Sequence, residues 1–370
     1  MVVNAVMDAG ANAAKGSSPM ANIELLRALC QVEGIPSRED LVRDLVANEM
    51  KSLVDELGVD ALGNLIGIKR GSNGPRVMIS AHMDEIGFLV KYIDESGFVR
   101  IQPVGGFDPR VLVAQRANVH TRAGEKLPAL VQPGTKPIHL LQPGDPRDVK
   151  IEDVFLDLGL SADAVRENVA IGDMVTLNRE TVVVGGNVAS KALDDRVGLY
   201  VMLESIRKVG SHLADIFAVA STQEEVGLRG AGTAAFEVRP DIGIALDVTL
   251  AGDIPGAAPY ATVTKLHGGA AIKIMDSSHL SNPRLVEHMR DIAEANGIPY
   301  QMEILPRGGT DAAAMQLSQA GAAAITISVP TRYLHSVNET ASIADIDACV
   351  DLLTRFLEEA GTRAYGYTLP

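Results

Sequence analysis

The order of elements predicted for the second half of the chain constrains its fold most strongly. From about Gly185, apolar runs of strand length alternate with helical patterns. The predicted strands are 215–221, 242–247, 270–275, 299–305 and 323–329, and the predicted helices are 195–209, 228–235, 284–295, 311–318 and 343–359. Asn282 and Ser342 are the expected N-caps of two of these helices. Such alternation predicts an α/β fold, with a mixed, largely parallel sheet and helices on both faces.

The first part of the chain is predicted to lead into the same sheet. Helical spacing of leucines predicts helices over 22–30 and 38–57, and strands are expected at 64–69 and 76–80. Residues 1–19 are rich in Ala, Gly, Asn and Ser and lack the apolar core of a secretory signal. We expect them to form a disordered leader.

The middle of the chain has a different character. Seven of the 18 prolines fall between Pro103 and Pro146. Short β-like runs at 88–93, 98–103, 116–121, 129–132 and 174–177 surround one short helix, expected at 161–166 with Ser161 near its start. This pattern predicts a small β-barrel or sandwich at 87–186. It would be inserted into a discontinuous α/β domain made of 20–86 and 187–370.

Composition excludes several classes of partner. The net charge of −14 and a pI near 5.0 argue against a broad nucleic-acid surface or an anionic membrane partner, since both require basic patches. No apolar run approaches the roughly 20 residues of a membrane span. Cys30 and Cys349 lie far apart in helix-like apolar patterns and are expected to be buried free thiols. The cytoplasm is the expected compartment.

Two adjacent acids, Glu224 and Glu225, follow the apolar run 216–220. Neighbouring side chains on an extended chain point in opposite directions, so the two carboxylates are expected to have different roles. Ionised carboxylates resist burial without a cation or a hydrogen-bond partner. One would therefore hold a metal and the other would handle a proton. The alternative interpretation is a solvated loop that carries two acids.

Other metal-binding side chains follow further predicted strands. They are His82 and Asp84 after 76–80, Asp247 at the end of 242–247, and His335 after 323–329. Asp194 precedes the helix at 195–209. Because the carboxyl ends of parallel strands meet at one edge, these side chains are expected to lie together. Imidazole and carboxylate form the ligand set of Zn²⁺, Co²⁺ or Mn²⁺. The remaining histidines are expected to be structural, in loops, in the β-insert or on helix surfaces: His120, His139, His212, His267, His279 and His288.

These motifs together resemble those of a known family. The matching runs are 80–87, 191–196, 223–227, 247–249, 308–312 and 330–336, in family order, and the insert adds 136–140 and 171–173. The sequence is similar to the M42 family of metallo-aminopeptidases, the glutamyl aminopeptidase or TET type of the MH clan, over about residues 20–360. The resemblance implies a fold of the di-zinc exopeptidase type.

The resemblance also implies a centre of two divalent metal ions per subunit, with Zn²⁺ or Co²⁺ favoured and Mn²⁺ allowed. His82 and Asp247 would hold one ion, Glu225 and His335 the other, and Asp194 would bridge both. The three carboxylates supply −3 against +4 from the two cations, so a bound hydroxide completes neutrality. The metals would lower the pKa of a bridging water.

The same resemblance implies roles for two further residues and the geometry of one peptide bond. Glu224 would be the general base that takes a proton from the water and passes it to the leaving amine. The Asp84 carboxylate would accept a hydrogen bond from the second ring nitrogen of His82 and fix its orientation. A cis peptide bond is implied between Asp194 and Asp195.

The implied activity is removal of N-terminal residues from peptides, catalysed by the α/β domain of 20–86 and 187–370. The resemblance also implies that the insert at 87–186 serves dimerisation and assembly, so that subunits form dimers and tetrahedral dodecamers. A related di-metal amidase or deacetylase is the nearest alternative, and a metal-independent glycoside hydrolase or a non-catalytic binding protein are further ones. Residues 308–312 with Arg332 and Tyr333 are candidates for substrate contacts. The alternative for the first of these is a helix-start turn with Thr310 as its cap.

Overall fold

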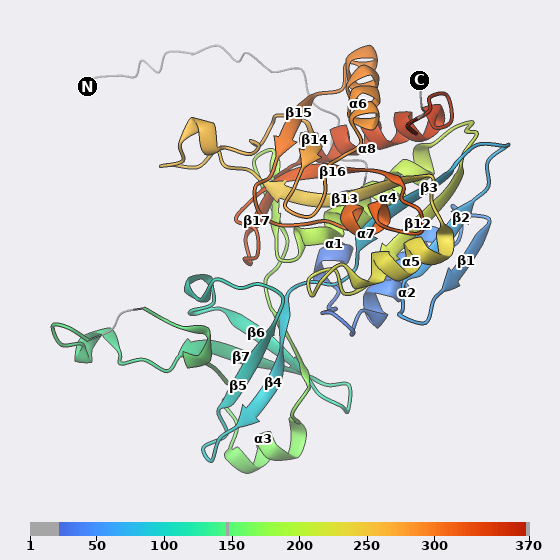
Figure 1. The fold of residues 1–370 in the computed structure, drawn as a ribbon. Helices are drawn as coiled ribbons and strands as arrows, with labels where there is room; N and C mark the ends of the chain where they lie inside the picture. The colour runs from blue at the N-terminus through green and yellow to red at the C-terminus, as the bar shows by residue number, and fades with distance from the viewer. Residues whose placement is uncertain (1–21, 146–147, 368–370) are drawn as a thin grey trace, which may run out of the picture.

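The computed structural model describes residues 22–145 and 148–367, which form a main α/β part with a smaller barrel below it (Figure 1). The leader predicted at 1–19 lies outside the described residues. The main part is built on an 11-stranded sheet. Its strands are β1 (Glu56–Val59), β2 (Leu65–Lys69), β3 (Arg76–His82), β10 (Val182–Val184), β11 (Asn187–Ser190), β12 (Asp215–Ser221), β13 (Ile242–Leu250), β14 (Ala270–Met275), β15 (Tyr300–Ile304), β16 (Ala323–Arg332) and β17 (Glu339–Ser342).

The centre of this sheet is parallel, which confirms the prediction. The strand order is β1-β2-β12-β3-β13-β16-β17-β11-β10, with β14 and β15 branching from β16. Parallel ladders join β12 to β3, β3 to β13, and β13 to β16. Antiparallel strands extend both edges, so the sheet as a whole is mixed. Four neighbouring strands therefore end at the same side of the molecule.

Helices cover both faces of the sheet. Alternate residues of β3 point to opposite faces: Val77 and Ile79 join a core with α1, α2, α4, α6 and α8, whereas Met78 joins one with α5 and α7. The helices are α1 (Ile23–Gln31), α2 (Asp40–Met50), α4 (Leu193–Lys208), α5 (Arg229–Val238), α6 (Pro283–Asn296), α7 (Ala312–Gln316) and α8 (Ile343–Glu359). Asn282 and Ser342 cap α6 and α8 through their side-chain oxygens, as predicted.

One predicted helix is too long. The expected helix at 38–57 ends at Met50 as α2, and Glu56–Val59 forms strand β1 instead. Leu57 and Val59 continue the apolar spacing of the helix in sequence, but they belong to a strand that pairs antiparallel with β2. The tertiary pairing overrides the local pattern.

The inserted segment forms a closed six-stranded barrel, as predicted. Its strands are β4 (Gly87–Ile93), β5 (Val99–Val104), β6 (Arg116–His120), β7 (Lys126–Pro133), β8 (Val154–Asp157) and β9 (Met174–Leu177), in the order β4-β5-β8-β7-β6-β9. Helix α3 (Ala162–Asn168) has Ser161 as its N-cap. The barrel has its own core, in which Phe88, Val119 and Val175 are fully buried. Its strands end at Leu177, and the following β10 pairs with β11 in the main sheet.

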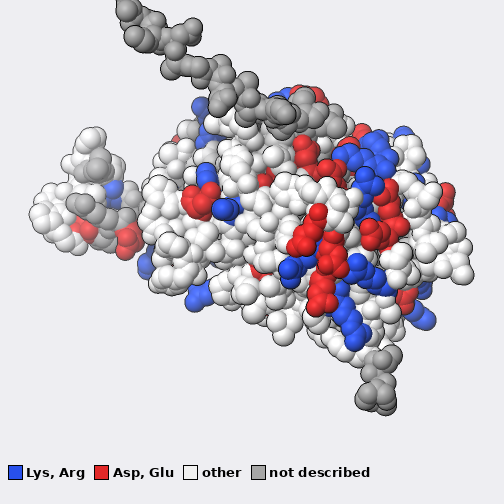
Figure 2. Space-filling model, turned by 90° about the horizontal axis from the view of Figure 1, so that it is seen from above, with Lys and Arg blue, Asp and Glu red and all other residues white. Residues whose placement is uncertain are grey.

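The cysteines and the surface charges also follow expectation. Cys30 and Cys349 are buried free thiols. On the face shown in Figure 2, basic and acidic side chains lie next to one another, without a broad basic area. Across residues 22–145 and 148–367, the helices are too short or too polar to cross a membrane.

Candidate metal centre

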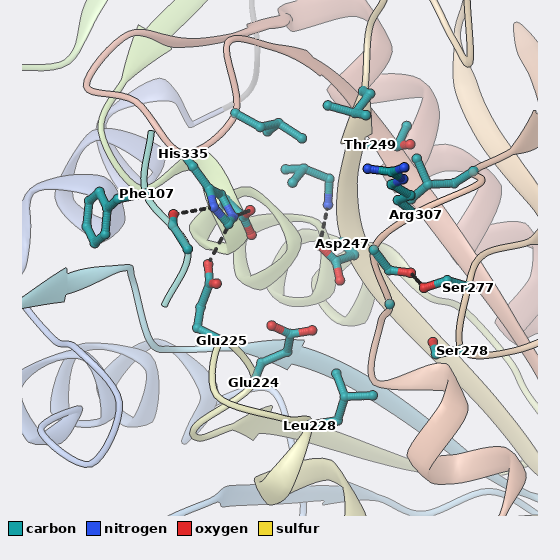
Figure 3. Close-up of a pocket in the computed structure, with 18 of the residues that line it drawn as sticks. Phe107, Glu224, Glu225, Leu228, Asp247, Thr249, Ser277, Ser278, Arg307 and His335 are labelled. Carbon is teal, nitrogen blue, oxygen red and sulfur yellow. Dashed lines mark hydrogen bonds and ion pairs between the residues drawn. The ribbon is translucent and has the colours of Figure 1, made fainter. Parts of the chain in front are cut away.

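Four neighbouring strands bring the predicted ligands to one end of the sheet. His82 is the last residue of β3, and Glu225 follows the end of β12. Asp247 lies inside β13, three residues before its end, and His335 follows β16. Because these strands are adjacent and parallel, their carboxyl ends bring the side chains together. Glu225, Asp247 and His335 line a cavity there (Figure 3).

Asp194 completes the group from the start of α4. The backbone there departs from helical geometry, with φ −73° and ψ 107°, and the Asp194–Asp195 peptide bond is cis, as the family resemblance implies. One carboxylate oxygen of Asp194 lies 3.1 Å from His82 Nε2, and the other lies 3.4 Å from His335 Nε2. A single carboxylate thus faces both imidazoles.

The ligand atoms form groups of the size that a metal ion requires. His82, Asp194 and Asp247 offer one atom each within 4.8 Å of one another, and so do Asp194, Glu225 and His335. These two groups share Asp194. A third group combines His82 with Glu224 and Glu225. The arrangement offers room for two cations on either side of one carboxylate.

The electrostatics of this cluster fit divalent cations. Burial, followed by the charge of Asp194, raises the pKa of Glu225 to about 7, and the same two causes raise the pKa of Asp247 well above its ordinary value. Burial alone would lower the pKa of His335, but Asp194 and Glu225 raise it to about 10. Burial opposes ionisation of Asp194, yet His335 and His82 hold its pKa below the usual range. Protonated histidines therefore offset the charge of the buried acids, and bound cations could supply that positive charge in their place.

Backbone groups hold the two sides of the cluster in place. His82 Nδ1 lies 2.9 Å from the backbone carbonyl of Asp84, whereas the Asp84 carboxylate is 3.6 Å away. The predicted hydrogen bond from the imidazole therefore goes to the Asp84 carbonyl instead of its carboxylate. That carboxylate accepts the backbone N–H groups of Glu224 and Glu225, each at 3.1 Å, because it is buried directly under their loop.

His335 has partners that sequence reasoning missed. Its Nδ1 lies 2.7 Å from the carbonyl oxygen of Gly106, in the loop that leaves the barrel after β5. Its backbone N–H donates to Glu339 Oε1 at 2.8 Å, and the N–H of Asp194 donates to Glu339 Oε2 at 3.0 Å. Burial, followed by the charge of Asp194, raises the pKa of Glu339 to about 8. The only hint in the sequence is an acid four residues after a candidate ligand.

A cavity of about 770 Å³ opens above the cluster. Phe107 and His335 lie on one side of it, and Thr249, Arg307 and Ser277 lie on the other (Figure 3). Glu224 and Glu225 lie between these two walls.

Part of the predicted substrate loop reaches this cavity. Gly308 and Gly309 line it, whereas Arg332 pairs with Asp253 at 3.0 Å and Tyr333 lines a neighbouring cavity. Thr310 does not cap α7, whose N-cap is Asp311. The Thr310 hydroxyl instead contacts Thr326 at 2.8 Å.

The other histidines remain outside the ligand groups found among the described residues. His279 is buried and contacts Asp276 at 2.9 Å. His288 belongs to α6 but is fully buried, not on the helix surface as expected, and it contacts Tyr365 and Glu359. Its position follows from the pairing with the C-terminal segment, which local sequence does not reveal.

Comparison with known proteins places this centre in context. The sequence profile of the M42 glutamyl aminopeptidases matches residues 63–352. A lysyl aminopeptidase of Pyrococcus furiosus is 37% identical over 349 residues, which cover 92% of this chain and 98% of the relative. The structure of an aminopeptidase from Desulfurococcus kamchatkensis is 40% identical, with a TM-score of 0.87, and covers 91% of this chain and 94% of the other. The TET1 peptidase of Pyrococcus horikoshii, described as able to form a tetrahedron or a large octahedral shell, is 32% identical with a TM-score of 0.81, covering 92% of this chain and all of the other.

Proposed function

Since the chain belongs to the M42 family of glutamyl aminopeptidases, and is thus a hydrolase of peptide bonds, we propose that it removes N-terminal residues from peptides at a centre of two divalent metal ions. The observation that carries this proposal is the pair of ligand groups that share Asp194. A single cation would leave the buried acids of one group with only a protonated histidine as counter-charge.

The residues on the two sides of Asp194 would hold one ion each. His82 and Asp247 serve the first, and Glu225 and His335 serve the second. Two imidazoles with three carboxylates suit Zn²⁺ or Co²⁺, and Mn²⁺ is also compatible. When bound, the ions supply a Lewis acid for the scissile carbonyl and lower the pKa of a water molecule.

Glu224 is the proposed general base. Its Oε2 lies 3.9 Å from His82 Nε2, and the side chain lies on the floor of the cavity (Figure 3). Burial raises the pKa of Glu224 well above its ordinary value. A carboxylate with a raised pKa accepts a proton more readily and can later donate it to the leaving amine.

Asp84 is the proposed orienting residue for both acids and for His82. Its carboxylate holds the backbone of Glu224 and Glu225, and its carbonyl oxygen accepts the Nδ1–H of His82. That hydrogen bond leaves Nε2 of His82 free to face a metal ion. Outer contacts of this kind fix the tautomer of a ligating imidazole.

We further propose that the subunits form dimers and a tetrahedral dodecamer. The support is the likeness to the TET1 peptidase over 92% of this chain, which includes the barrel. In such a shell the cavities would face an enclosed space, and peptides would reach them more easily than folded proteins.

The first test is metal dependence. Dialysis against a chelator should abolish hydrolysis of aminoacyl anilides, and Zn²⁺ or Co²⁺ should restore it. Full hydrolysis in excess chelator would contradict the proposal. Parallel assays with N-acetyl and aryl-glucoside substrates separate it from the amidase, deacetylase and glycoside hydrolase alternatives, which neither the family nor the paired imidazoles favour.

A further inference from the structure

Glu339 is a buried acid that the mechanism above does not use. It begins β17 and is 2% exposed. Each of its carboxylate oxygens accepts a backbone N–H from a different proposed ligand, His335 at 2.8 Å and Asp194 at 3.0 Å. We propose that Glu339 is a positioning residue that fixes the distance between these two ligands and thereby sets the affinity of the metal site they share. The inference rests on the proposed metal centre.

The strand arrangement explains why one residue can hold both ligands. β17 lies between β16 and β11 in the sheet. β16 leads to His335, and β11 leads to Asp194. The first residue of β17 is therefore flanked by the two chain segments that carry the ligands. Ladders on both sides fix its backbone, with Glu339 opposite Ser190 of β11.

Both ligands lie in backbone that regular structure does not support. His335 has φ +59°, in the left-handed region that non-glycine residues rarely adopt. Asp194 lies in the non-helical first turn of α4. A buried N–H without a partner is destabilising, and a carboxylate is a stronger acceptor than a neutral oxygen. Glu339 satisfies both groups at once.

Glu339 is placed to position the two ligands, and not to bind a metal ion or a substrate itself. It is absent from the three candidate ligand groups and from the lining of the large cavity. It borders a space of about 10 Å³ beside Asp194 and Glu225, which is too small for a substrate. Its effect on a metal ion would therefore act through the backbone of the two ligands.

Three variants separate this role from a merely structural one. In Glu339→Gln, one acceptor oxygen becomes an amide that cannot accept an N–H. In Glu339→Asp, the charge stays but the side chain is one methylene too short to reach both groups. Glu204→Gln is the matched control, because Glu204 is also a buried acid, at 5% exposure, and it contacts Arg207 on α4 away from the ligands.

The probe is Co²⁺ alone, titrated into chelator-treated protein and followed by calorimetry and visible absorption. Wild type and Glu204→Gln should bind two equivalents. Both Glu339 variants should bind one equivalent, the one at Asp194, Glu225 and His335, about 10–100-fold less tightly, which is the range typical for loss of an outer contact to a ligand. Both variants leave an N–H without its partner and should lower the melting temperature in chelator. The rise on adding Co²⁺ should in addition be smaller than in wild type.

Several outcomes would overturn the inference. Wild-type Co²⁺ affinity in Glu339→Gln would show that the two hydrogen bonds to Glu339 are not needed. Wild-type affinity in Glu339→Asp would show that the charge matters and the length of the side chain does not. An equal loss of melting temperature with and without Co²⁺ would assign Glu339 a structural role only. If wild type itself bound no Co²⁺, the proposed metal centre would fail instead, so the two failures are distinguishable.

Discussion

Glu224 and Glu225 are adjacent in sequence but contact different imidazoles. Glu225 Oε1 lies 3.5 Å from His335, and Glu224 Oε2 lies 3.9 Å from His82. Both backbones are held by the one carboxylate of Asp84. The pair therefore behaves as one rigid unit with two differently directed side chains, which suits one acid for coordination and the other for proton transfer.

This division predicts different losses for two matched variants. Glu224→Gln should retain two metal ions but lose roughly 10²–10⁴ in kcat, because it removes a general base and no ligand. Glu225→Gln should bind less metal, because it removes a ligand, while it keeps the general base. Metal content by mass spectrometry and kcat with an aminoacyl anilide test both. Near-normal turnover in Glu224→Gln would contradict the role of Glu224 as general base.

At the scale of single residues, the sequence could predict the residues whose side chains carry candidate ligand atoms. His82, Glu225, Asp247 and His335 carry ligand atoms in their side chains and follow or end apolar runs, so their meeting could be expected. Gly106 and Glu339 were missed because they contact the candidate ligands through a backbone carbonyl and through backbone N–H groups. Every residue has such groups, and only the folded chain shows which of them meet.

At the scale of elements, the loop after β5 connects the barrel to the metal centre. Gly105 has φ +88°, and a Cβ added there would lie 2.5 Å from Ile86 Cγ2 and 3.4 Å from a carboxylate oxygen of Glu225. The next residue, Gly106, supplies the carbonyl for His335. The conformation of this loop and the orientation of His335 are therefore coupled.

Gly105→Ala should weaken metal binding, and Gly124→Ala is its control. Gly124 has φ +82° in the turn before β7, but a Cβ there meets no atom within 4 Å. Both variants should lose about 1–2 kcal/mol of stability from the left-handed backbone. Only Gly105→Ala should also reduce Co²⁺ affinity, as measured by calorimetry. Equal affinities in the two variants would show that the loop does not position His335.

Elements with long, periodic patterns could be predicted, whereas several of the short ones could not. α6 and α8 begin at their predicted caps, and the central strands appear where apolar runs predict them. β8 has only four residues, and its membership of the barrel depends on pairing with β5 and β7. β1 was taken for the end of a helix because its apolar spacing fits both structures.

At the scale of the whole molecule, we predict that the barrel serves assembly. The predicted dodecamer would have a mass near twelve times the 39.1 kDa of one chain. Light scattering coupled to size-exclusion chromatography would measure it. The assembled enzyme should cleave short peptides and spare a folded protein with an accessible N-terminus. A monomer at micromolar concentration would contradict the assembly.

The distribution of the ligands along the chain has a consequence for biosynthesis. The first proposed ligand is His82 and the last is His335, and the complete barrel is made between them. A growing chain therefore cannot complete the centre until nearly all of it has left the peptidyl-transferase site. Products of premature termination before residue 335 would lack one of the proposed ligands.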